Sequence, residues 1–284
     1  MKWFWLALCM VGLSACEPLD LERPGIPLQY GLRYDEPTSG TEWTRNVTTN
    51  DLEAPLLVEI PLVADSNGLP AIPPNNYLPL QENSTPLDLV FSSLVDTLLF
   101  PPSQASLPSG WADSLTARVG TFVAALKRPP GRIVLGINWR KVPDLQVQLQ
   151  RIESEWSFEG IPLAFSFLAS DPPEGSWRYG DFLAVAYPSL NEPKRECMVL
   201  NPKIAELATI KPARPVFIYQ SNVIGLDKTD QLRNLLRFWP AETEIEGLVL
   251  NSIYDRHPGR DSVSYFGFAN DTAFTAFLES YQSR

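Results

Sequence analysis

The sequence predicts an α/β fold, a (β/α)8 TIM-type barrel, and two features of the chain lead to this fold class. Short runs that are apolar throughout alternate with longer stretches whose apolar residues recur at helical spacing. Strands without a polar face are typical of a parallel sheet that helices cover. The length of 284 residues also suits a barrel, which needs about 250 residues. A doubly wound open sheet is the alternative, and it is disfavoured because no phosphate-binding loop is present.

The predicted elements are clearest in the second half of the chain. A strand over 132–137 is followed by a helix over 142–156 whose apolar residues form one stripe. The first third is less regular, and its prolines between residues 70 and 79 predict a long surface loop. The other expected strands span residues 28–34, 56–63, 87–99, 162–168, 182–187, 215–219 and 247–253, and the other expected helices span 112–127, a segment after Asp227 and a segment from residue 272.

The N-terminus has the pattern of a bacterial lipoprotein signal peptide. A single basic residue, Lys2, precedes an apolar run over residues 3–11 that is too short to span a bilayer. The tetrapeptide Leu-Ser-Ala-Cys that ends at Cys16 matches the lipobox, in which the thiol is diacylated and the preceding peptide bond is cut. We expect lipidation of Cys16 with fatty acids such as palmitate. An ordinary signal peptide with an incidental cysteine is the alternative.

Three segments follow from this pattern. Residues 1–15 are expected to be the signal peptide, residues 16–27 a membrane tether, and residues 28–284 the barrel domain. Acyl chains on Cys16 would hold the protein at the membrane, and Glu17 after the lipidated cysteine favours the outer membrane, facing the periplasm. The formal charge of −10 argues against nucleic acid as a partner and against binding of anionic lipid by the protein surface.

Few residues are available for metal or cofactor chemistry. His257 is the only histidine, which excludes sites built from several histidines. Cys9 belongs to the expected signal peptide and Cys16 to the anchor, so Cys197 has no partner for an intramolecular disulfide in the mature chain. The sequence contains no Walker loop, Rossmann glycine fingerprint or GxSxG elbow. We therefore predict no metal and no cofactor.

Several segments of the second half follow an order known from one enzyme family. They are residues 136–138, 180–188, 214–221, 246–255 and 265–268. Over residues 105–284 this order resembles retaining glycoside hydrolases with a TIM barrel. In this resemblance residues 136–138 end strand four of the barrel. The segments 180–188, 214–221 and 246–255 correspond to strands six, seven and eight. The resemblance is a pattern of positions rather than a strict motif.

The resemblance implies two glutamates, an acid/base after strand four and a nucleophile at the tip of strand seven. Retaining hydrolysis needs two carboxyl groups about 5–5.5 Å apart. In this sequence Asn138 is followed by Trp139, and the nucleophile position holds Gln220. An indole cannot protonate a leaving oxygen, and an amide is a poor nucleophile that does not titrate. We therefore expect no hydrolysis; were the protein an enzyme, it would be a glycoside hydrolase.

The side chains at the expected strand tips nevertheless suit carbohydrate. Aromatic rings stack on sugar rings, and amides form hydrogen bonds with hydroxyl groups. The expected ligand-binding residues are Asn138, Trp139, Tyr187, Tyr219, Gln220 and Asn251. The alternative is that these side chains plug the barrel mouth. Plugging is favoured for Tyr187 and Asn251, whereas both roles stay open for Trp139 and Gln220.

Three functions remain. The first is an envelope lipoprotein that binds a glycan or an envelope protein partner without catalysis. The second is an active glycoside hydrolase that uses displaced carboxylates, Asp171 after strand five and Asp255 after strand eight. Asp255 and His257 are more simply part of a solvated loop, and Asp181 begins a strand, which places it at the stability end of a barrel. The third is a protein-interaction scaffold whose pocket is filled by its own side chains.

Overall fold

The structure is a computed structural model, and it describes most of the chain between residues 28 and 250. The described residues are 28–33, 56–74, 77–84, 87–92, 107–137, 139, 142–187, 192–210, 216–220, 228–240 and 243–250. The expected signal peptide, the tether and the expected helix from residue 272 lie outside them. Within the described ranges no helix has both the length and the apolar character that a membrane crossing requires.

The longer strands form one parallel sheet. They are β1 (Leu28–Arg33), β2 (Leu56–Pro61), β5 (Leu87–Ser92), β6 (Ile133–Gly136), β7 (Leu163–Phe165), β8 (Phe167–Leu168), β9 (Leu183–Tyr187), β10 (Val216–Gln220) and β11 (Ile245–Leu250). Their order in the sheet is β7-β6-β5-β2-β1-β11-β10-β9-β8, and each neighbouring pair is parallel.

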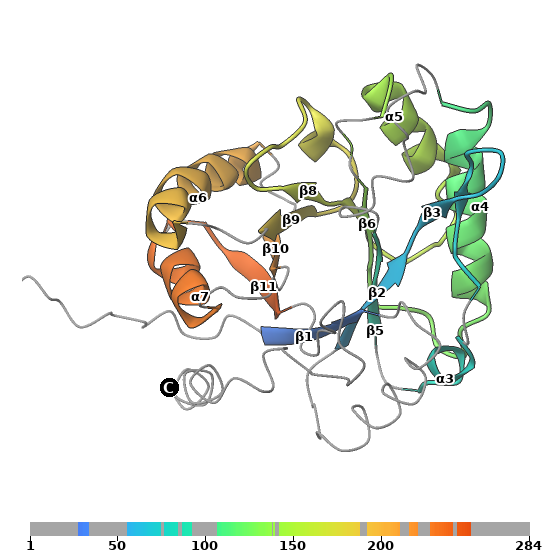
Figure 1. Ribbon diagram of the computed structural model, residues 1–284, viewed down its shortest axis with the longest axis horizontal. Helices are drawn as coiled ribbons and strands as arrows, with labels where there is room; N and C mark the ends of the chain where they lie inside the picture. The colour runs from blue at the N-terminus through green and yellow to red at the C-terminus, as the bar shows by residue number, and fades with distance from the viewer. Residues whose placement is uncertain are drawn as a thin grey trace, which may run out of the picture.

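The sheet closes on itself through β7 and β8. Only Ser166 separates the two, and β7 pairs with β6 while β8 pairs with β9, so they are two parts of one strand. The nine segments of the sheet therefore make eight strands around a closed barrel (Figure 1). This confirms the predicted TIM barrel. The expected strands four, six, seven and eight are β6, β9, β10 and β11, and the first third supplies β1, β2 and β5.

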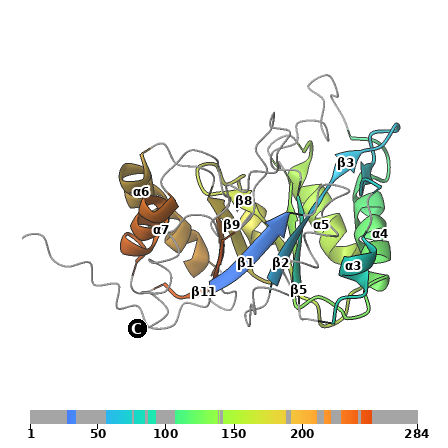
Figure 2. The same cartoon turned by 60° about the horizontal axis from the view of Figure 1, so that its bottom comes forward.

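Helices lie outside the ring of strands. They are α4 (Trp111–Ala124), α5 (Leu145–Glu155), α6 (Pro193–Thr209) and α7 (Lys228–Arg237). In two views α4 and α5 cover one side of the barrel and α6 and α7 cover another (Figures 1 and 2). The periodic patterns predicted α4, α5 and α7. They did not predict α6, because Pro202 lies inside it. Pro193 begins the helix, where no backbone N–H is needed.

A small hairpin and a short helix precede the third barrel strand. β3 (Val63–Ala64) pairs antiparallel with β4 (Pro70–Ala71), and α3 spans Leu78–Gln81. The Oδ1 atom of Asp65 accepts hydrogen bonds from two backbone N–H groups of the connecting turn. The expected long surface loop between residues 70 and 79 is therefore partly wrong. Pro70 starts β4 and Pro79 lies in the first turn of α3, where a missing N–H does not cost a hydrogen bond, whereas Pro73 and Pro74 lie in irregular chain between the two.

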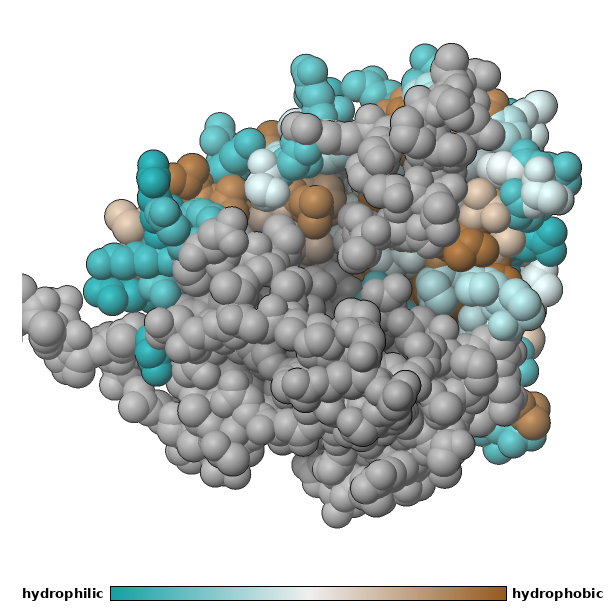
Figure 3. Space-filling view, in the orientation of Figure 1, coloured by the Kyte–Doolittle hydropathy of each residue, from teal (hydrophilic) through white to brown (hydrophobic). Residues whose placement is uncertain are grey.

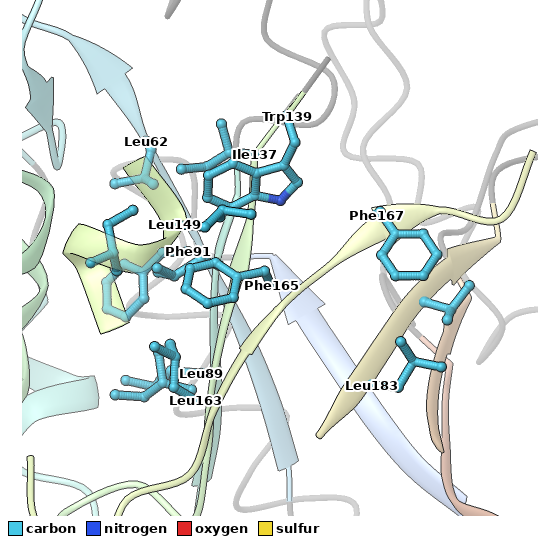
Figure 4. Packing of buried hydrophobic residues seen from close by; sticks show 14 of the residues in the cluster. Leu62, Leu89, Phe91, Ile137, Trp139, Leu149, Leu163, Phe165, Phe167 and Leu183 are labelled. Carbon is cyan, nitrogen blue, oxygen red and sulfur yellow. The ribbon is translucent and has the colours of Figure 1, made fainter. Parts of the chain in front are cut away.

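The core has two layers because successive strand residues point to opposite faces. One buried cluster fills the barrel interior, and a larger one lies between the strands and the helices. The interior cluster consists of Leu57, Val90, Val134, Ala164, Phe182, Ala184 and Ala186. Their neighbours on the strands belong to the outer layer. There Phe91 and Phe165 pack beneath Trp139, which follows β6, and beneath Leu149 of α5 (Figure 4). On the surface, hydrophilic residues dominate the upper rim of the molecule, with apolar residues scattered between them (Figure 3).

An ion pair closes the barrel interior near the amino ends of the strands. The Nε atom of Arg132 lies 3.0 Å from Oδ2 of Asp88, and its Nη1 atom lies 3.4 Å from Oε1 of Glu246. The same guanidinium stands 5.7 Å from the ring centre of Phe182. The Asp88 side chain is only 5% exposed, so Arg132 compensates a carboxylate that has lost most of its water.

Asp181 lies at this same end of the barrel. Its backbone N–H donates to the carbonyl of Leu163 at 2.6 Å, and its Oδ2 atom accepts from the N–H of Leu163 at 2.9 Å. The preceding N–H, of Gly180, donates to Oε1 of Glu153 on α5 at 2.9 Å. Asp181 therefore joins the amino ends of β7 and β9, as its place at the start of a strand predicts, and it acts in stability.

Gly180→Ala is expected to destabilise the fold by more than about 2 kcal/mol. Gly180 has φ of +76°, and a Cβ atom there would lie 2.7 Å from the backbone oxygen of Leu163. Gly160→Ala is the matched control, because Gly160 has φ of +79° but no atom within 4 Å of the added Cβ. Urea unfolding measures both changes. Equal losses in the two variants would show that the close approach to Leu163 contributes nothing.

Candidate functional site

A groove of about 570 Å³ opens at the carboxyl-terminal end of the barrel. It lies between the start of α5, which follows β6, and residues 172–174, which lead from β8 to the short helix η3 (Ser176–Arg178). Its apolar lining comes from Trp139, Val142, Leu145, Val147, Pro172 and Pro173. TIM barrels place their sites at this end of the strands.

The polar lining consists of two acids and an amide, Asp144, Gln146 and Glu174. Asp144 has φ of 50° and ψ of 41°, and it is the one non-glycine residue with positive φ in the described chain. It occupies the N-cap of α5, yet its side chain makes no capping hydrogen bond. Backbone strain of this kind collects at functional sites. The Asp144 carboxylate thus lines the groove rather than the helix end.

Trp139 forms part of the groove but is almost fully enclosed. Its residue exposure is 2%, and its Nε1 atom donates to the backbone oxygen of Ser166 at 2.7 Å. Its ring meets Phe165 edge to face, with centroids 5.4 Å apart. Figure 4 shows the indole above Phe165, at the end of β6. The indole therefore forms the floor of the groove and connects the loop after β6 to the fifth barrel strand, which β7 and β8 form. Little of its ring face is free for stacking on a ligand.

Tyr187 ends β9 but does not line the groove. It is fully buried in the outer layer, and its hydroxyl donates to Oδ1 of Asn201 on α6 at 2.8 Å. The Nδ2 atom of Asn201 in turn donates to the backbone oxygen of Leu235 at 2.7 Å. Burial raises the pKa of Tyr187 above its ordinary value. Tyr187 therefore joins β9 to α6 and α7 and neither contacts the groove nor plugs the barrel mouth, because its position on the strand faces the helices.

The two positions that the resemblance singled out lie after β6 and at the end of β10. Gln220 is the last residue of β10, in register with Tyr187 on one side and Leu250 on the other, and Tyr219 is in register with Ala186. The side chains of Tyr219 and Gln220 lie outside the described part of the structure, as do Cys16, Asn138, Asn251, Asp255 and His257. Their expected roles stay predictions.

Asp171 lies beside the groove. Its backbone N–H donates to the carbonyl of Leu168 at 2.9 Å, and the next two residues, Pro172 and Pro173, line the groove. Asp171 is half-buried and therefore remains a candidate for the displaced acid. In the described ranges no three side chains of His, Cys, Asp or Glu gather closely enough to hold a metal ion.

Sequence reasoning missed the polar side chains inside the barrel. Glu59, Asp88, Ser92 and Ser166 are each less than a tenth exposed, and each shares a strand face with the interior cluster. The signal that could have found them is a charged or hydroxyl residue inside an otherwise apolar strand. Glu59 in Leu-Leu-Val-Glu-Ile-Pro is the clearest case.

Cys197 is expected to be inert in the folded protein. It is fully buried on α6, and burial raises its pKa from 9.0 to about 12. At pH 8 the native thiol should therefore hold roughly a thousandfold less thiolate than an unfolded one. Because the native state binds this proton more tightly, the associated stability is complete below about pH 9 and is lost as the pH rises towards 12.

Alkylation with iodoacetamide at pH 8, followed by mass spectrometry of the Cys197 peptide, measures this expectation. Unfolding in urea should restore fast modification. Cys197→Ala is the control for stability. Its free energy of unfolding should fall less between pH 9 and pH 12 than that of the wild type. Rapid alkylation of the folded chain would contradict the buried placement.

Neither the family models nor the curated proteins contain a match to this chain. Two solved structures align with it, both of mutant tryptophan synthase alpha-subunits from the hyperthermophile Pyrococcus furiosus. One has 13% sequence identity and a TM-score of 0.47, covering 90% of this chain and 95% of that chain. The other has 13% identity and a TM-score of 0.44, covering 80% of this chain and 87% of that chain. The strand order of the chain itself makes it a TIM barrel of the α/β class.

Proposed function

We propose that this protein is a lipoprotein of the bacterial cell envelope whose barrel binds a glycan in the groove beside Trp139 without hydrolysing it. The observation that carries the proposal is the groove, which lies at the carboxyl ends of the strands and combines apolar surface with oxygen acceptors. The resemblance to retaining glycoside hydrolases supports the same ligand class. In that pattern Trp139 and Gln220 stand where the catalytic glutamates would be.

The lining of the groove matches the two surfaces of a sugar. A pyranose has apolar C–H faces and an edge of hydroxyl groups. Pro172, Pro173 and Val142 offer apolar contact, while the carboxylates of Asp144 and Glu174 accept hydrogen bonds from hydroxyls. The support therefore comes from prolines and acids around the groove, and it replaces the aromatic stacking first expected of Trp139.

Calorimetric titration of the full-length lipoprotein in detergent with soluble linear glycans tests the proposal. We expect saturable binding and no release of reducing sugar. Glu174→Gln should weaken binding about tenfold, because a charged acceptor is lost. Ser154→Ala, a hydroxyl on the exposed side of α5, is the control and should bind as the wild type does. Failure of the wild type to bind any glycan of the panel would overturn the proposal.

The groove is expected to discriminate against acidic glycans. Its nine described lining residues include two carboxylates and neither Lys nor Arg. Uronic acid units should therefore bind about tenfold more weakly than neutral units at low salt, and the difference should shrink as salt rises. Competition between a neutral glucan and polygalacturonate measures this. The double variant Asp144→Asn, Glu174→Gln should lose the preference, and tighter binding of polygalacturonate by the wild type would contradict it.

An active hydrolase is the second candidate, because Asp171 lies directly beside the groove. In that case the displaced carboxylates Asp171 and Asp255 would supply the acid and the base. Incubation with envelope and exported polysaccharides, followed by an assay for reducing ends, separates the two candidates. Sugar release that Asp171→Asn or Asp255→Asn abolishes would establish hydrolysis in place of binding alone.

The anchor at Cys16 is a separate part of the proposal. The lipobox supports attachment to the outer membrane, with the barrel facing the periplasm. Cys16→Ala should move the protein from the membrane fraction to the soluble fraction after a salt wash. A variant that stays with the membrane would instead favour attachment through an envelope protein partner. Such a partner also suits the third function, a protein-interaction scaffold whose pocket is filled by its own side chains around the enclosed Trp139.

A further inference from the structure

The groove beside Trp139 has two walls, and each wall carries both apolar and polar side chains. One wall is the start of α5 with the residue Val142 before it, and the other is the segment 172–174. The space between them measures about 570 Å³. The polar side chains of both walls belong to exposed residues, which are Asp144, Gln146 and Glu174. A ligand therefore has both room in the groove and access to its polar groups.

The two walls approach each other at Gln146. A Cβ atom on Gly175 would lie 3.2 Å from Nε2 and 3.9 Å from Cδ of Gln146, so the Gln146 amide lies against the backbone of Gly175. Glu174 directly precedes Gly175 and also lines the groove. An amide and a carboxylate thus border the same part of the groove. Within the described ranges neither side chain forms a hydrogen bond or ion pair with the protein, so both are available to a ligand.

The wall that contains Glu174 is held in place by the short helix behind it. The backbone N–H and the hydroxyl of Ser176 both donate to the carbonyl of Pro173, at 3.2 Å and 2.9 Å, and Ser176 is only 1% exposed. Pro172 and Pro173 have their φ angles fixed by their rings. A wall that is already in position loses little conformational entropy when a ligand binds.

We propose that the groove selects sugar units that carry an acetamido group, with Gln146 and Glu174 as the residues that recognise this group. The proposal rests on the glycan-binding function inferred above and names its ligand class. An acetamido group has an N–H donor, a carbonyl acceptor and a terminal methyl group. The Gln146 amide can donate to the carbonyl, and the Glu174 carboxylate can accept from the N–H. Pro172 and Pro173 offer apolar surface to the methyl group.

Other substituents match less of this lining. A hydroxyl group can donate to Glu174 or accept from Gln146, but it has no apolar part to cover the prolines. An ammonium group is attracted to the carboxylates of Asp144 and Glu174, but it cannot accept a hydrogen bond from the Gln146 amide. The acetamido group is the one of the three that combines a donor, an acceptor and an apolar part.

Three β-1,4-linked tetrasaccharides that differ only in the substituent at C2 test this proposal. The substituent is a hydroxyl group in cellotetraose, an ammonium group in chitotetraose, and an acetamido group in the fully N-acetylated chitotetraose. Each is titrated calorimetrically into the full-length protein in detergent at pH 6. We expect the acetamido chain to bind roughly tenfold more tightly than the hydroxyl chain. Tightest binding of the ammonium chain would overturn the proposal and show that the carboxylates select by charge.

Gln146→Leu tests the named contact, because leucine removes the amide and keeps much of the side-chain volume. The variant should bind the acetamido chain about tenfold more weakly than the wild type does, with little change for the hydroxyl chain. Gln150→Leu is the matched control, since Gln150 is an exposed residue one turn further along α5 and does not line the groove. Thermal unfolding should give both variants the melting temperature of the wild type, because both glutamines are exposed.

The outcomes separate this proposal from the glycan-binding function. Equal binding of the acetamido and hydroxyl chains by the wild type would overturn the selectivity and leave the glycan-binding function intact. Equal weakening of both chains by Gln146→Leu would overturn the assigned role of Gln146. Failure of all three chains to bind, while other glycans bind, would overturn the acetamido proposal alone. Absence of all glycan binding by the wild type would overturn both proposals.

Discussion

Replacement of Trp139 by alanine is expected to lower the free energy of unfolding by about 3–5 kcal/mol. The side chain is 2% exposed, packs edge to face on Phe165, and donates a buried hydrogen bond to Ser166. Removal leaves a cavity between β6, strand five and α5, and it leaves the Ser166 carbonyl without its donor. Urea unfolding followed by circular dichroism measures the loss.

Trp139→Phe separates the two contributions. Phenylalanine keeps an aromatic ring against Phe165 but cannot donate to Ser166, so the loss should fall to about 1–3 kcal/mol. Val147→Ala is the control within the same groove, because Val147 is 62% exposed, and it should cost less than about 0.5 kcal/mol. A loss below about 1 kcal/mol for Trp139→Ala would mean that the indole does not hold this part of the barrel together.

Arg132→Leu is expected to cost about 3–5 kcal/mol, because it removes the guanidinium that lies 3.0 Å from the buried carboxylate of Asp88. Leucine also loses the contact of the guanidinium with Phe182 and the attraction to Glu246. The double variant Asp88→Leu, Arg132→Leu should recover much of the loss, since the buried carboxylate is then removed together with its cation and Glu246, 40% exposed, stays solvated by water. A double-mutant cycle in urea gives the coupling between the two residues.

A second arginine–aspartate pair supplies the control. Arg151 and Asp113 lie 2.6 Å apart and form two hydrogen bonds between α5 and α4, yet their side chains are 54% and 43% exposed. Arg151→Leu should cost less than about 1 kcal/mol, because water solvates both groups when the pair is broken. The Arg151–Asp113 pair is thus expected to contribute less to stability than the Arg132–Asp88 pair, although its atoms lie closer together. Equal losses in Arg132→Leu and Arg151→Leu would contradict the role of burial.

The fold could be predicted because strands and helices leave different periods in the sequence. The runs at 28–34, 56–63 and 87–99 became β1, β2 and β5, and the segments assigned to strands four, six, seven and eight took those places in the barrel. Helix α6 escaped notice because Pro202 lies inside it. Its stability comes from packing on α7, which a local pattern does not show.

The candidate site was harder to predict, because a strand that is buried on both sides does not reveal which face is inside. Tyr187 was expected at the barrel mouth, as a ligand contact or as a plug, but its side of β9 faces Asn201 and the helices. Glu59 and Ser166 lie on the interior side, and no sequence period distinguishes them from their neighbours. The groove depends on the approach of residues 172–174 to the start of α5, which is set by tertiary packing alone.

Closure of the barrel through the interrupted strand formed by β7 and β8 has a consequence for association between molecules. Each of the eight barrel strands has a neighbour on both sides, so the barrel offers no free edge to a strand of another molecule. An open parallel sheet at high local concentration would otherwise risk pairing edge to edge with its own copies. Pairing through the barrel sheet is therefore excluded, and among the described strands only the short β3–β4 hairpin has free edges.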